Sequence, residues 1–237
     1  MTLLAPERSA TCLPRWATPR NPGRATHGGR VSKAAAMLGS SFMPWQQQVS
    51  DVANEIDPAT GHRFYRTVVL SVMRQQGKTT LTLPTWVERC ASWPGVSVAW
   101  TMQTGTDARE KWLEEHVPAL QASPLASSIT VRKQNGSEHV RFSNGSLQRL
   151  MASGKSSGHG KVIDLGMIDE AMAQPDDRLH QALRPAMKTR YRDVVLPDGR
   201  VQKLPGAQLW IISTVGPAGE SEWFHSWMDA GRAAVEQ

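Results

Sequence analysis

The feature that most constrains this chain is a Gly-Lys-Thr triplet between a predicted buried strand and a predicted helix. The strand prediction covers Arg66 to Val72 (RTVVLSV), and the helix prediction covers Thr79 to Cys90. A phosphate loop needs backbone amides at a helix start, a lysine that reaches the β- and γ-phosphates, and a hydroxyl for magnesium. The intervening segment offers this set, and its candidate nucleotide-binding residues are Arg74, Gln75, Gln76, Gly77, Lys78, Thr79 and Thr80. The first glycine of the usual pattern is absent, because Val72 stands five residues before Gly77, and the triplet alone also recurs by chance.

A second signal lies roughly ninety residues downstream, where a short apolar run ends in two adjacent carboxylates. The run Leu165 to Ile168 belongs to a predicted strand, and Asp169 and Glu170 follow it directly. In a parallel sheet the loops after the strands open at one edge, so these carboxylates can face the phosphate loop. Asp169 would then hold Mg²⁺ through its waters, and Glu170 would polarise the water that attacks the γ-phosphate. An isolated acidic pair is commonly a solvated cap of the next helix, but its combination with the phosphate loop favours the catalytic interpretation.

Two shorter motifs are candidates for the same site. Ser213 and Thr214 end a predicted buried strand over Ala207 to Ser213. Hydroxyls at this place can sense the γ-phosphate and relay its loss, although an ordinary strand end with a turn is the alternative. Pro44-Trp45-Gln46 stands ahead of the first core strand. We expect the Gln46 carboxamide to bind the adenine edge through paired donor and acceptor groups, and Trp45 to anchor the chain in the core rather than stack on the base.

Predicted strands alternate with predicted helices along the rest of the chain. The further elements are a strand over Gly95 to Thr101 and helices over Asp107 to Leu120, Pro175 to Met187 and Glu220 to Ala230. Asn135-Gly136 and Asn144-Gly145 are hairpin-turn signals, because both central positions of such a turn need positive φ. This order predicts an α/β fold with a mostly parallel central sheet, helices on both faces and an inserted β-hairpin. With the phosphate loop and the second carboxylate, this order predicts a P-loop NTPase of the ASCE type.

Composition excludes several classes of protein. A chain of 237 residues that is 40% hydrophobic can bury the core of one globular domain. Its apolar runs, such as Val68 to Met73, are far shorter than the ~20 residues of a membrane helix, so we expect no membrane association. Its two cysteines, Cys12 and Cys90, can form neither a disulfide framework nor a four-ligand zinc site, which favours a reducing compartment.

The formal charge of +6 is concentrated at the N-terminus. Residues 1 to 35 carry six basic side chains against Glu7 alone, and the remainder carries 21 basic and 20 acidic residues. Because this segment is rich in Pro, Arg, Gly and Ala and has no period, we expect residues 1 to 36 to form a flexible basic arm. Residues 37 to 237 would then form the folded domain.

Any contact with DNA must therefore depend on local stripes of charge. One stripe runs from Arg132 to Lys161 with six basic residues against Glu138, and another runs from Arg178 to Lys203 with seven against Asp193 and Asp198. A solvated face without a partner is an equally good interpretation of both stripes.

Taken in order and spacing, these motifs resemble the ATPase domain of the large terminase subunit of tailed bacteriophages. The resemblance covers roughly Phe42 to Gly216. It includes Thr101-Met102-Gln103-Thr104 after the second strand and the Phe142 to Ser146 segment that leads into Ser153 to Gly160. Large terminases often carry an arginine early in the phosphate loop, where Arg74 stands, so the missing glycine supports the resemblance.

The resemblance implies an ATP-driven motor with ATP and Mg²⁺ as cofactors. It would assemble as a homo-oligomeric ring, usually a pentamer, on the portal of a procapsid in the host cytoplasm, work with a small terminase subunit, and pump double-stranded DNA. Gln46 would contact adenine, and Lys78, Thr79 and Asp169 would contact the phosphates and Mg²⁺. The catalytic residues would be Glu170, Lys78 and Arg74, with Ser213 and Thr214 as the coupling motif. An arginine from a neighbouring subunit completes such sites in related enzymes, and Arg141 and Arg149 are the candidates by location.

The chain departs from the family after Thr214, where large terminases continue into a nuclease domain. Here only Glu220, Glu222, Asp229 and Glu236 follow, so we expect no nuclease site in this chain, and cutting would belong to another domain or polypeptide. Two alternatives remain open. A helicase-like nucleic-acid-stimulated ATPase would need a second core domain, and a nucleotide-binding assembly module with negligible turnover would not need Glu170.

Overall fold

The central sheet has seven strands, and five consecutive strands, counted from one edge, run parallel to one another. In this computed structural model the described residues are 14–151, 162–188, 191–195, 199–214, 216 and 221–236. In spatial order the strands are β1 (Thr67–Ser71), β9 (Gln208–Ser213), β6 (Leu165–Ile168), β2 (Ser97–Thr101), β5 (Leu147–Leu150), β4 (His139–Phe142) and β3 (Ile129–Arg132). Strands β4 and β3 continue the sheet in antiparallel pairing beyond β5.

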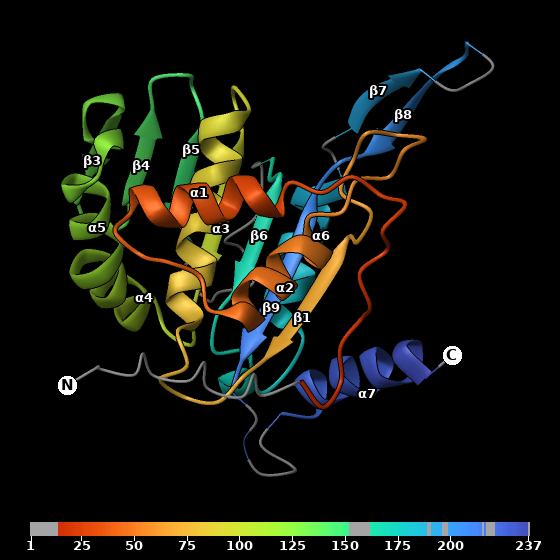
Figure 1. Ribbon diagram of the computed structural model, residues 1–237. Helices are drawn as coiled ribbons and strands as arrows, with labels where there is room; N and C mark the ends of the chain where they lie inside the picture. The colour runs from red at the N-terminus through yellow and green to blue at the C-terminus, as the bar shows by residue number, and fades with distance from the viewer. Residues whose placement is uncertain are drawn as a thin grey trace, which may run out of the picture.

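Helices cover the two faces of the sheet unequally (Figure 1). One face packs against α1 (Gly28–Met37), α2 (Pro44–Ala53), α3 (Lys78–Ser92), α4 (Gly105–Lys111), the π-helix η1 (Trp112–His116), α5 (Val117–Ala122) and the 3₁₀ turn η2 (Pro124–Ser128). The other packs against the short 3₁₀ helix η3 (Ala171–Ala173), α6 (Arg178–Lys188) and α7 (Glu222–Glu236). Within the described residues, no helix is long and apolar enough to cross a bilayer.

The alternation of side chains along the strands divides the core into two layers. On β2, Val98 and Trp100 belong to the layer under α3, whereas Ala99 faces the layer under α6. The first layer is rich in fully buried indoles, including those of Trp86, Trp112 and Trp210. Aromatic side chains of this size dominate core energetics, so the α3 side is the more strongly packed half of the molecule.

The α/β fold with a mostly parallel sheet is confirmed, and the antiparallel strands are an extension of its edge. The turn signals at Gly136 and Gly145 do fall between β3, β4 and β5, and both glycines have positive φ. Asn135 and Asn144 do not have positive φ. The loops 133–138 and 143–146 are longer than a two-residue turn and therefore need only one left-handed residue each.

Two elements differ from the sequence prediction. The helix expected over Asp107 to Leu120 is divided into α4, the π-helix η1 and α5, and Ala108, Trp112 and His116 are its buried residues on one face. The hairpin of β7 (Tyr191–Val195) and β8 (Val201–Pro205) was not predicted, since this region was interpreted only as a basic stripe. In Figure 1 it projects from the rest of the molecule at the upper right.

The prediction of a flexible arm over residues 1 to 36 is wrong for its C-terminal part. Val31, Ala34 and Ala35 form a buried stripe on α1, which packs against α2 and α3. The stripe consists mostly of alanine, so the small size of its side chains concealed the helical pattern while allowing a close approach. Gly28 shows how close this is, because an added Cβ would lie 2.6 Å from the Cα of Asp51 on α2. Residues 1–13 lie outside the described residues.

The segment before α1 is attached to the domain by charged side chains. Glu55 is fully buried, and its carboxylate accepts hydrogen bonds from Arg20 and Arg24, each at 2.9 Å. The backbone N–H of Asn21 donates to the same carboxylate at 2.8 Å. The basic residues that suggested an arm therefore compensate a buried charge of the domain.

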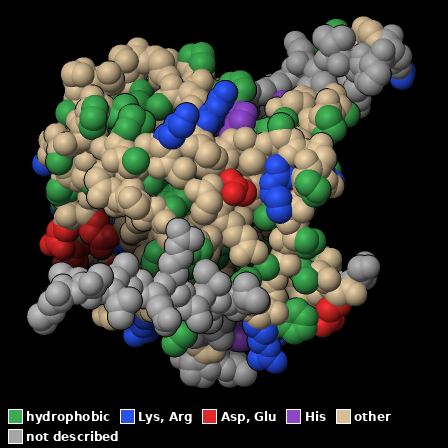
Figure 2. Space-filling model, in the orientation of Figure 1, with side chains coloured by type: hydrophobic (Ala, Val, Ile, Leu, Met, Phe, Trp, Pro, Cys, Tyr) green, Lys and Arg blue, Asp and Glu red, His purple; other side chains and the backbone are tan. Residues whose placement is uncertain are grey.

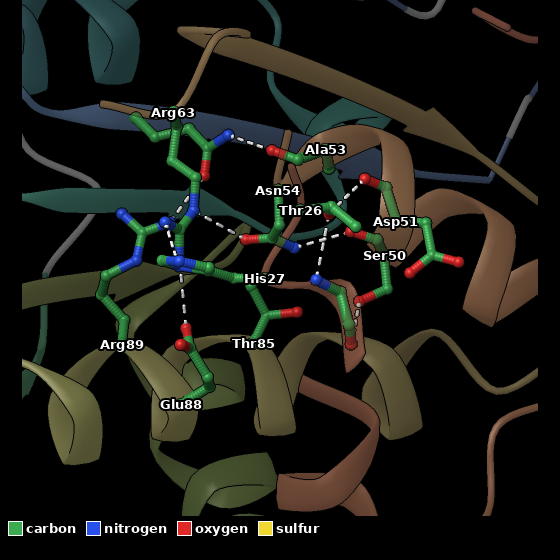
Figure 3. A network of polar contacts seen from close by, with 12 residues as sticks. Thr26, His27, Ser50, Asp51, Ala53, Asn54, Arg63, Thr85, Glu88 and Arg89 are labelled. Atoms are coloured by element: carbon green, nitrogen blue, oxygen red, sulfur yellow. Dashed lines mark hydrogen bonds and ion pairs between the residues drawn. The ribbon is translucent and has the colours of Figure 1, made fainter. Parts of the chain in front are cut away.

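A buried polar network joins this segment to α2 and α3 (Figure 3). Its centre is Arg63, whose Nε donates to Asn54 Oδ1 at 3.0 Å and whose Nη2 donates to Glu88 Oε2 at 3.3 Å. The Nη1 group of Arg63 lies 2.7 Å from Nδ1 of His27. Burial, with the charge of Arg63 as a second cause, lowers the pKa of His27 to about 4, so the ring is neutral at pH 7 and accepts this hydrogen bond.

We expect Arg63→Met to lower the free energy of unfolding by about 3–5 kcal/mol, because it leaves the Glu88 carboxylate buried without this counter-charge. The measurement is urea unfolding at pH 7. The matched control is Arg178→Met, whose ion pair with Asp176 is exposed and should contribute less than about 1 kcal/mol. Equal losses in the two variants would contradict the role given to the network.

Candidate active site

Three strand ends bring the sequence motifs together at one edge of the sheet, the lower edge in Figure 1. Strand β9 lies between β1 and β6 and pairs in parallel with both. The segments that follow these strands open into one cavity of about 710 Å³. It is lined by Arg74, Gln75, Gly77, Lys78, Thr79, Gln103, Lys111, Glu115, Glu170, Met172, Ala173, Ser213, Thr214 and Gly216. The expected approach of the phosphate loop to the acidic strand is therefore present.

The loop between β1 and α3 has the backbone of an anion-binding nest. Gln75 and Gly77 are both left-handed, with φ of 59° and 83°, and α3 begins at the next residue, Lys78. Left-handed residues alternating with right-handed ones turn successive N–H groups toward one point, and the helix start adds its own free N–H groups. The loop forms with Val72 at the position of the missing first glycine, and its left-handed residues are Gln75 and Gly77.

Gln46 lies so close to Gly77 that a residue with a side chain would not fit at position 77 without displacing Gln46. A Cβ at Gly77 would lie 2.8 Å from Nε2 of Gln46 and 3.1 Å from Cε of Met43. The Gln46 carboxamide is fully buried, its Nε2 donates to the carbonyl of Gly77 at 2.8 Å, and its Oε1 accepts from the N–H of Met43 at 2.7 Å. Gln46 thus holds the phosphate loop in place. Its carboxamide was expected to bind adenine, but both its nitrogen and its oxygen are already hydrogen-bonded to the backbone of this chain. The neighbouring Trp45 packs against the core, as predicted.

Lys78 is the first residue of α3, and its ammonium group donates to Oγ1 of Thr214 at 2.6 Å. Its pKa is lowered, chiefly because burial disfavours the charged form, while the charge of Asp169 opposes this shift. A partly desolvated ammonium in contact with a neutral hydroxyl is poised to bind an anion. The Lys78–Thr214 contact also connects the start of α3 to the end of β9.

Asp169 and Glu170 occupy different environments at the end of β6. The Asp169 side chain is fully buried, and its Oδ2 accepts a hydrogen bond from Nζ of Lys111 at 2.9 Å. Its Oδ1 accepts from the N–H of Glu170 at 3.0 Å. Glu170 has a left-handed backbone, with φ 54° and ψ 43°, and lines the cavity. A non-glycine residue in this conformation is strained, and such strain is concentrated at functional sites.

The two hydroxyls at the end of β9 have different partners. Thr214 contacts Lys78, whereas the buried Ser213 accepts a hydrogen bond from the N–H of Met172 at 2.9 Å. Met172 belongs to η3, directly after Glu170 and Ala171. The end of β9 therefore bridges the phosphate loop and the segment that follows the acidic pair.

The other predicted residues are placed unequally. Arg74 is exposed and Thr79 is partly exposed, and both line the cavity. The predicted nucleotide and metal ligands that do not line it are Gln46, Gln76, Thr80 and Asp169. Arg141 on β4 and Arg149 on β5 lie away from the cavity, toward the other end of the sheet. Burial, with the charge of Arg141 as a second cause, lowers the pKa of Arg149. Ser153 to Gly160 lies outside the described residues.

Six residues of the cavity were not among the predicted site residues, namely Gln103, Lys111, Glu115, Met172, Ala173 and Gly216. Gln103 follows β2 directly and belongs to a segment that the terminase resemblance included. Its position after a parallel strand could therefore have predicted that it lies at the same sheet edge. Lys111 and Glu115 come from α4 and η1, where nothing in the sequence distinguishes them from solvated helix charges.

The oxygen groups of this edge fit a hard divalent cation. The Asp169 carboxylate and the Thr79 hydroxyl belong to segments that meet at the cavity. Among the described residues, no cluster of three or more His, Cys, Asp or Glu could enclose a metal. One carboxylate and one hydroxyl are enough protein ligands for Mg²⁺, because Mg²⁺ usually keeps several waters and binds substrate phosphates as well.

Comparison with solved structures identifies the fold. The large terminase of bacteriophage HK97 superposes with a TM-score of 0.68 at 15% sequence identity, over 89% of this chain and 42% of that chain. The ATPase domain of the Thermus phage P74-26 large terminase superposes with a TM-score of 0.54 at 19% identity, over 81% of this chain and 71% of that one. This chain has the fold of a large terminase ATPase domain.

The terminase fold also occurs in the large terminase of a thermophilic bacteriophage, with a TM-score of 0.53 at 15% identity, over 85% of this chain and 44% of that one. The chain therefore spans less than half of this terminase and of the HK97 terminase. No protein-family model matches its sequence, and neither does any curated protein.

We expect Gly77→Ala to weaken binding of a fluorescent ATP analogue about tenfold or more, because the new methyl group collides with Gln46 beneath the phosphate loop. The matched control is Gly95→Ala. Gly95 also has positive φ, at 67°, but no atom lies within 4 Å of the added Cβ. Both variants should lose a similar ~1 kcal/mol of stability from backbone strain, whereas only Gly77→Ala should lose binding. Unchanged binding in Gly77→Ala would contradict the contact with Gln46.

Proposed function

We propose that this chain is the ATP-hydrolysing motor domain of a phage terminase large subunit, which drives translocation of double-stranded DNA into the procapsid. The observation that carries the proposal is one cavity lined by the phosphate loop, by Glu170 and by the hydroxyls of β9, with the buried Asp169 bonded to Lys111 in its wall. The terminase fold supports the same conclusion. The second carboxylate, Glu170, favours turnover over a module that only binds nucleotide.

In this proposal each group of the cavity has a defined part. The N–H groups of the loop and the ammonium of Lys78 bind the β- and γ-phosphates, and Arg74 reaches the γ-phosphate from the exposed side of the loop. Thr79 and Asp169 would hold Mg²⁺, which when bound neutralises phosphate charge. We propose that Gln46, which the sequence suggests as an adenine ligand, acts mainly by holding Gly77 in place.

The chemical step is an in-line displacement at the γ-phosphorus. Water attacks the phosphorus, the bond to the oxygen that bridges the β- and γ-phosphates breaks, and ADP leaves as phosphate forms. Glu170 orients the water and accepts its proton, a role suited to a carboxylate that lines the cavity beside Lys78. We propose that Arg141 or Arg149 of a neighbouring subunit in a ring completes the site.

The contacts of Ser213 and Thr214 suggest how hydrolysis reaches the rest of the domain. Loss of the γ-phosphate changes the partners available to Lys78, and Lys78 contacts Thr214. Ser213 holds the N–H of Met172 and so links the same strand end to η3. A change at the phosphates can therefore move two segments together. This motor would act in the host cytoplasm, at the portal, with a small terminase subunit and with nuclease function in another domain or chain.

We expect Glu170→Gln to lower the rate of ATP hydrolysis about 100-fold or more while leaving nucleotide binding measurable, because the substitution removes the proton acceptor and keeps the shape. Phosphate release with Mg²⁺ measures the rate. The matched control is Glu115→Gln, the same change at an exposed position of the same cavity, which should stay within about threefold of the original rate. If both variants turned over equally, Glu170 would not be the base. Binding without turnover in the unaltered chain would favour the assembly-module alternative.

The basic face of β3, β4 and β5 is the proposed DNA contact. Register places Arg132, Arg141 and Arg149 on the sheet face opposite Val131, Val140 and Gln148, which point toward the core under α3 and α4. Arg132 and Arg141 are exposed, and Lys133 follows directly after β3. These side chains form one stripe suited to a phosphate backbone.

We expect sequence-independent DNA binding that falls about 100-fold between 50 and 200 mM salt, as about four phosphate contacts would give. The double variant Arg132→Glu, Arg141→Glu should abolish it. The matched control, Arg30→Glu with Lys33→Glu, reverses the same charge at exposed positions of α1 on the other side of the sheet and should bind almost normally. Fluorescence anisotropy with two unrelated duplexes is the measurement. Retained binding in the β3–β4 variant would place the DNA on another surface.

A further inference from the structure

Lys111 contacts the carboxylate that the proposed function assigns to the metal. Its Nζ lies 2.9 Å from Oδ2 of Asp169, and the two side chains are 16% and 0% exposed. The remaining carboxylate oxygen, Oδ1, accepts the N–H of Glu170. Both oxygens of Asp169 are therefore already bonded by groups of the chain itself.

Lys111 makes this contact although acidic side chains are closer in sequence. Asp107 stands four residues before it, and Glu114 and Glu115 stand three and four residues after it on η1. Figure 2 shows acidic side chains gathered at the lower left, over the α4 region of Figure 1. A solvated lysine on such a segment would pair with these neighbours. Lys111 instead turns inward to a fully buried carboxylate, so the pair compensates a charge that would otherwise be buried alone.

The local backbone holds Lys111 at the cavity wall. It is the last residue of α4, and the next residue, Trp112, is fully buried with its Nε1 donating to Gln148 at 2.9 Å. Nζ of Lys111 lies 6.0 Å from the ring centre of Trp100, which is fully buried on the adjacent β2. The π-helix begins directly after Lys111, and single π-turns are frequent at functional sites.

The formal charges at the cavity are balanced before a ligand arrives. Three cationic side chains, those of Arg74, Lys78 and Lys111, stand with the three carboxylates of Glu115, Glu170 and Asp169. A divalent cation bound to Asp169 would stand beside the ammonium of Lys111, which is 2.9 Å from the same carboxylate. Coulomb repulsion between the two cations opposes this arrangement. The metal and Lys111 must therefore compete for Asp169.

We propose that Lys111 is the counter-ion of Asp169 in the nucleotide-free site and that Mg²⁺ arriving with nucleotide displaces it, so that Lys111 sets the Mg²⁺ concentration at which the site loads. This inference rests on the proposed function, since it takes Asp169 as the metal ligand. Lys111 is a positioning residue in this scheme. Its displaced ammonium remains at the wall of a cavity that then holds a polyphosphate.

The test is Lys111→Met, which keeps the aliphatic stem and removes the charge. In EDTA the variant should melt at a lower temperature than the unaltered chain, because Asp169 has lost its partner. Mg²⁺ alone should raise the melting temperature of the variant more than that of the unaltered chain. In a titration with a fluorescent ATP analogue, the Mg²⁺ concentration for half-maximal binding should fall about fivefold or more.

Two further variants separate charge from general effects. Arg109→Met removes another ion pair of the same helix, that with Glu138, and should leave the Mg²⁺ requirement unchanged. Lys111→Arg keeps a cation and should resemble the unaltered chain. Combined with Asp169→Asn, Lys111→Met should no longer change the Mg²⁺ requirement, because the shared carboxylate is absent.

Other outcomes overturn the inference. An unchanged Mg²⁺ requirement in Lys111→Met would show that Lys111 does not compete with the metal. Weaker nucleotide binding in EDTA would make Lys111 a phosphate ligand instead. An unaltered chain that binds no nucleotide at all would contradict the proposed function itself, and the melting experiment with Mg²⁺ alone would then still decide whether Lys111 and the metal share Asp169.

Discussion

The parallel pairing of β9 with both β1 and β6 is the constraint on which the rest of the site depends. Residues 67 to 71 of β1 align with residues 209 to 213 of β9, which in turn aligns with β6. A slip of one residue would reverse the faces of β9 and move Ser213 away from Met172. The start of β9 is pinned by Gln208, whose buried Nε2 donates to the carbonyls of Ala53 and Tyr65, each at 2.8 Å. Buried hydrogen bonds thus fix the register of β9 at its start, and this register places Ser213 and Thr214 at the site at its other end.

The polar groups of the cavity are bonded to one another. Lys78 contacts Thr214, Gln46 holds Gly77, and Lys111 pairs with Asp169. Each pair joins segments from different strand ends or helices, so a ligand that takes one member away from the other also changes how two segments are connected. In the proposed function, such a site would transmit ligand binding to the fold without a long relay, because the bonds that the ligand replaces are themselves the connections between elements.

Much of the fold could be predicted because its signals are local. Buried parallel strands appear as short β-branched runs, and the residues that follow them stand at one sheet edge wherever the connections are βαβ units. The phosphate loop, the acidic pair and the end of β9 were found in this way, and the structure gathers the loop, Glu170 and the end of β9 around one cavity. Helix α1 was missed because its buried stripe is mostly alanine, and β7 and β8 were missed because their charges suggested a solvated stripe. Lys111 was missed because its partner lies far away along the chain.

The sequence by itself determined which chemical groups stand at the ends of strands: an ammonium and hydroxyls at the start of α3, two carboxylates after β6, and two hydroxyls after β9. These depend on residue type and on the local pattern of apolar side chains, and both can be recognised in a short window. Only the tertiary structure decided that Gln46 supports the loop and that Lys111 occupies the carboxylate of Asp169. The physical reason is that a buried polar group must find a partner wherever packing offers one, and packing is settled by the whole chain rather than by its neighbours in sequence.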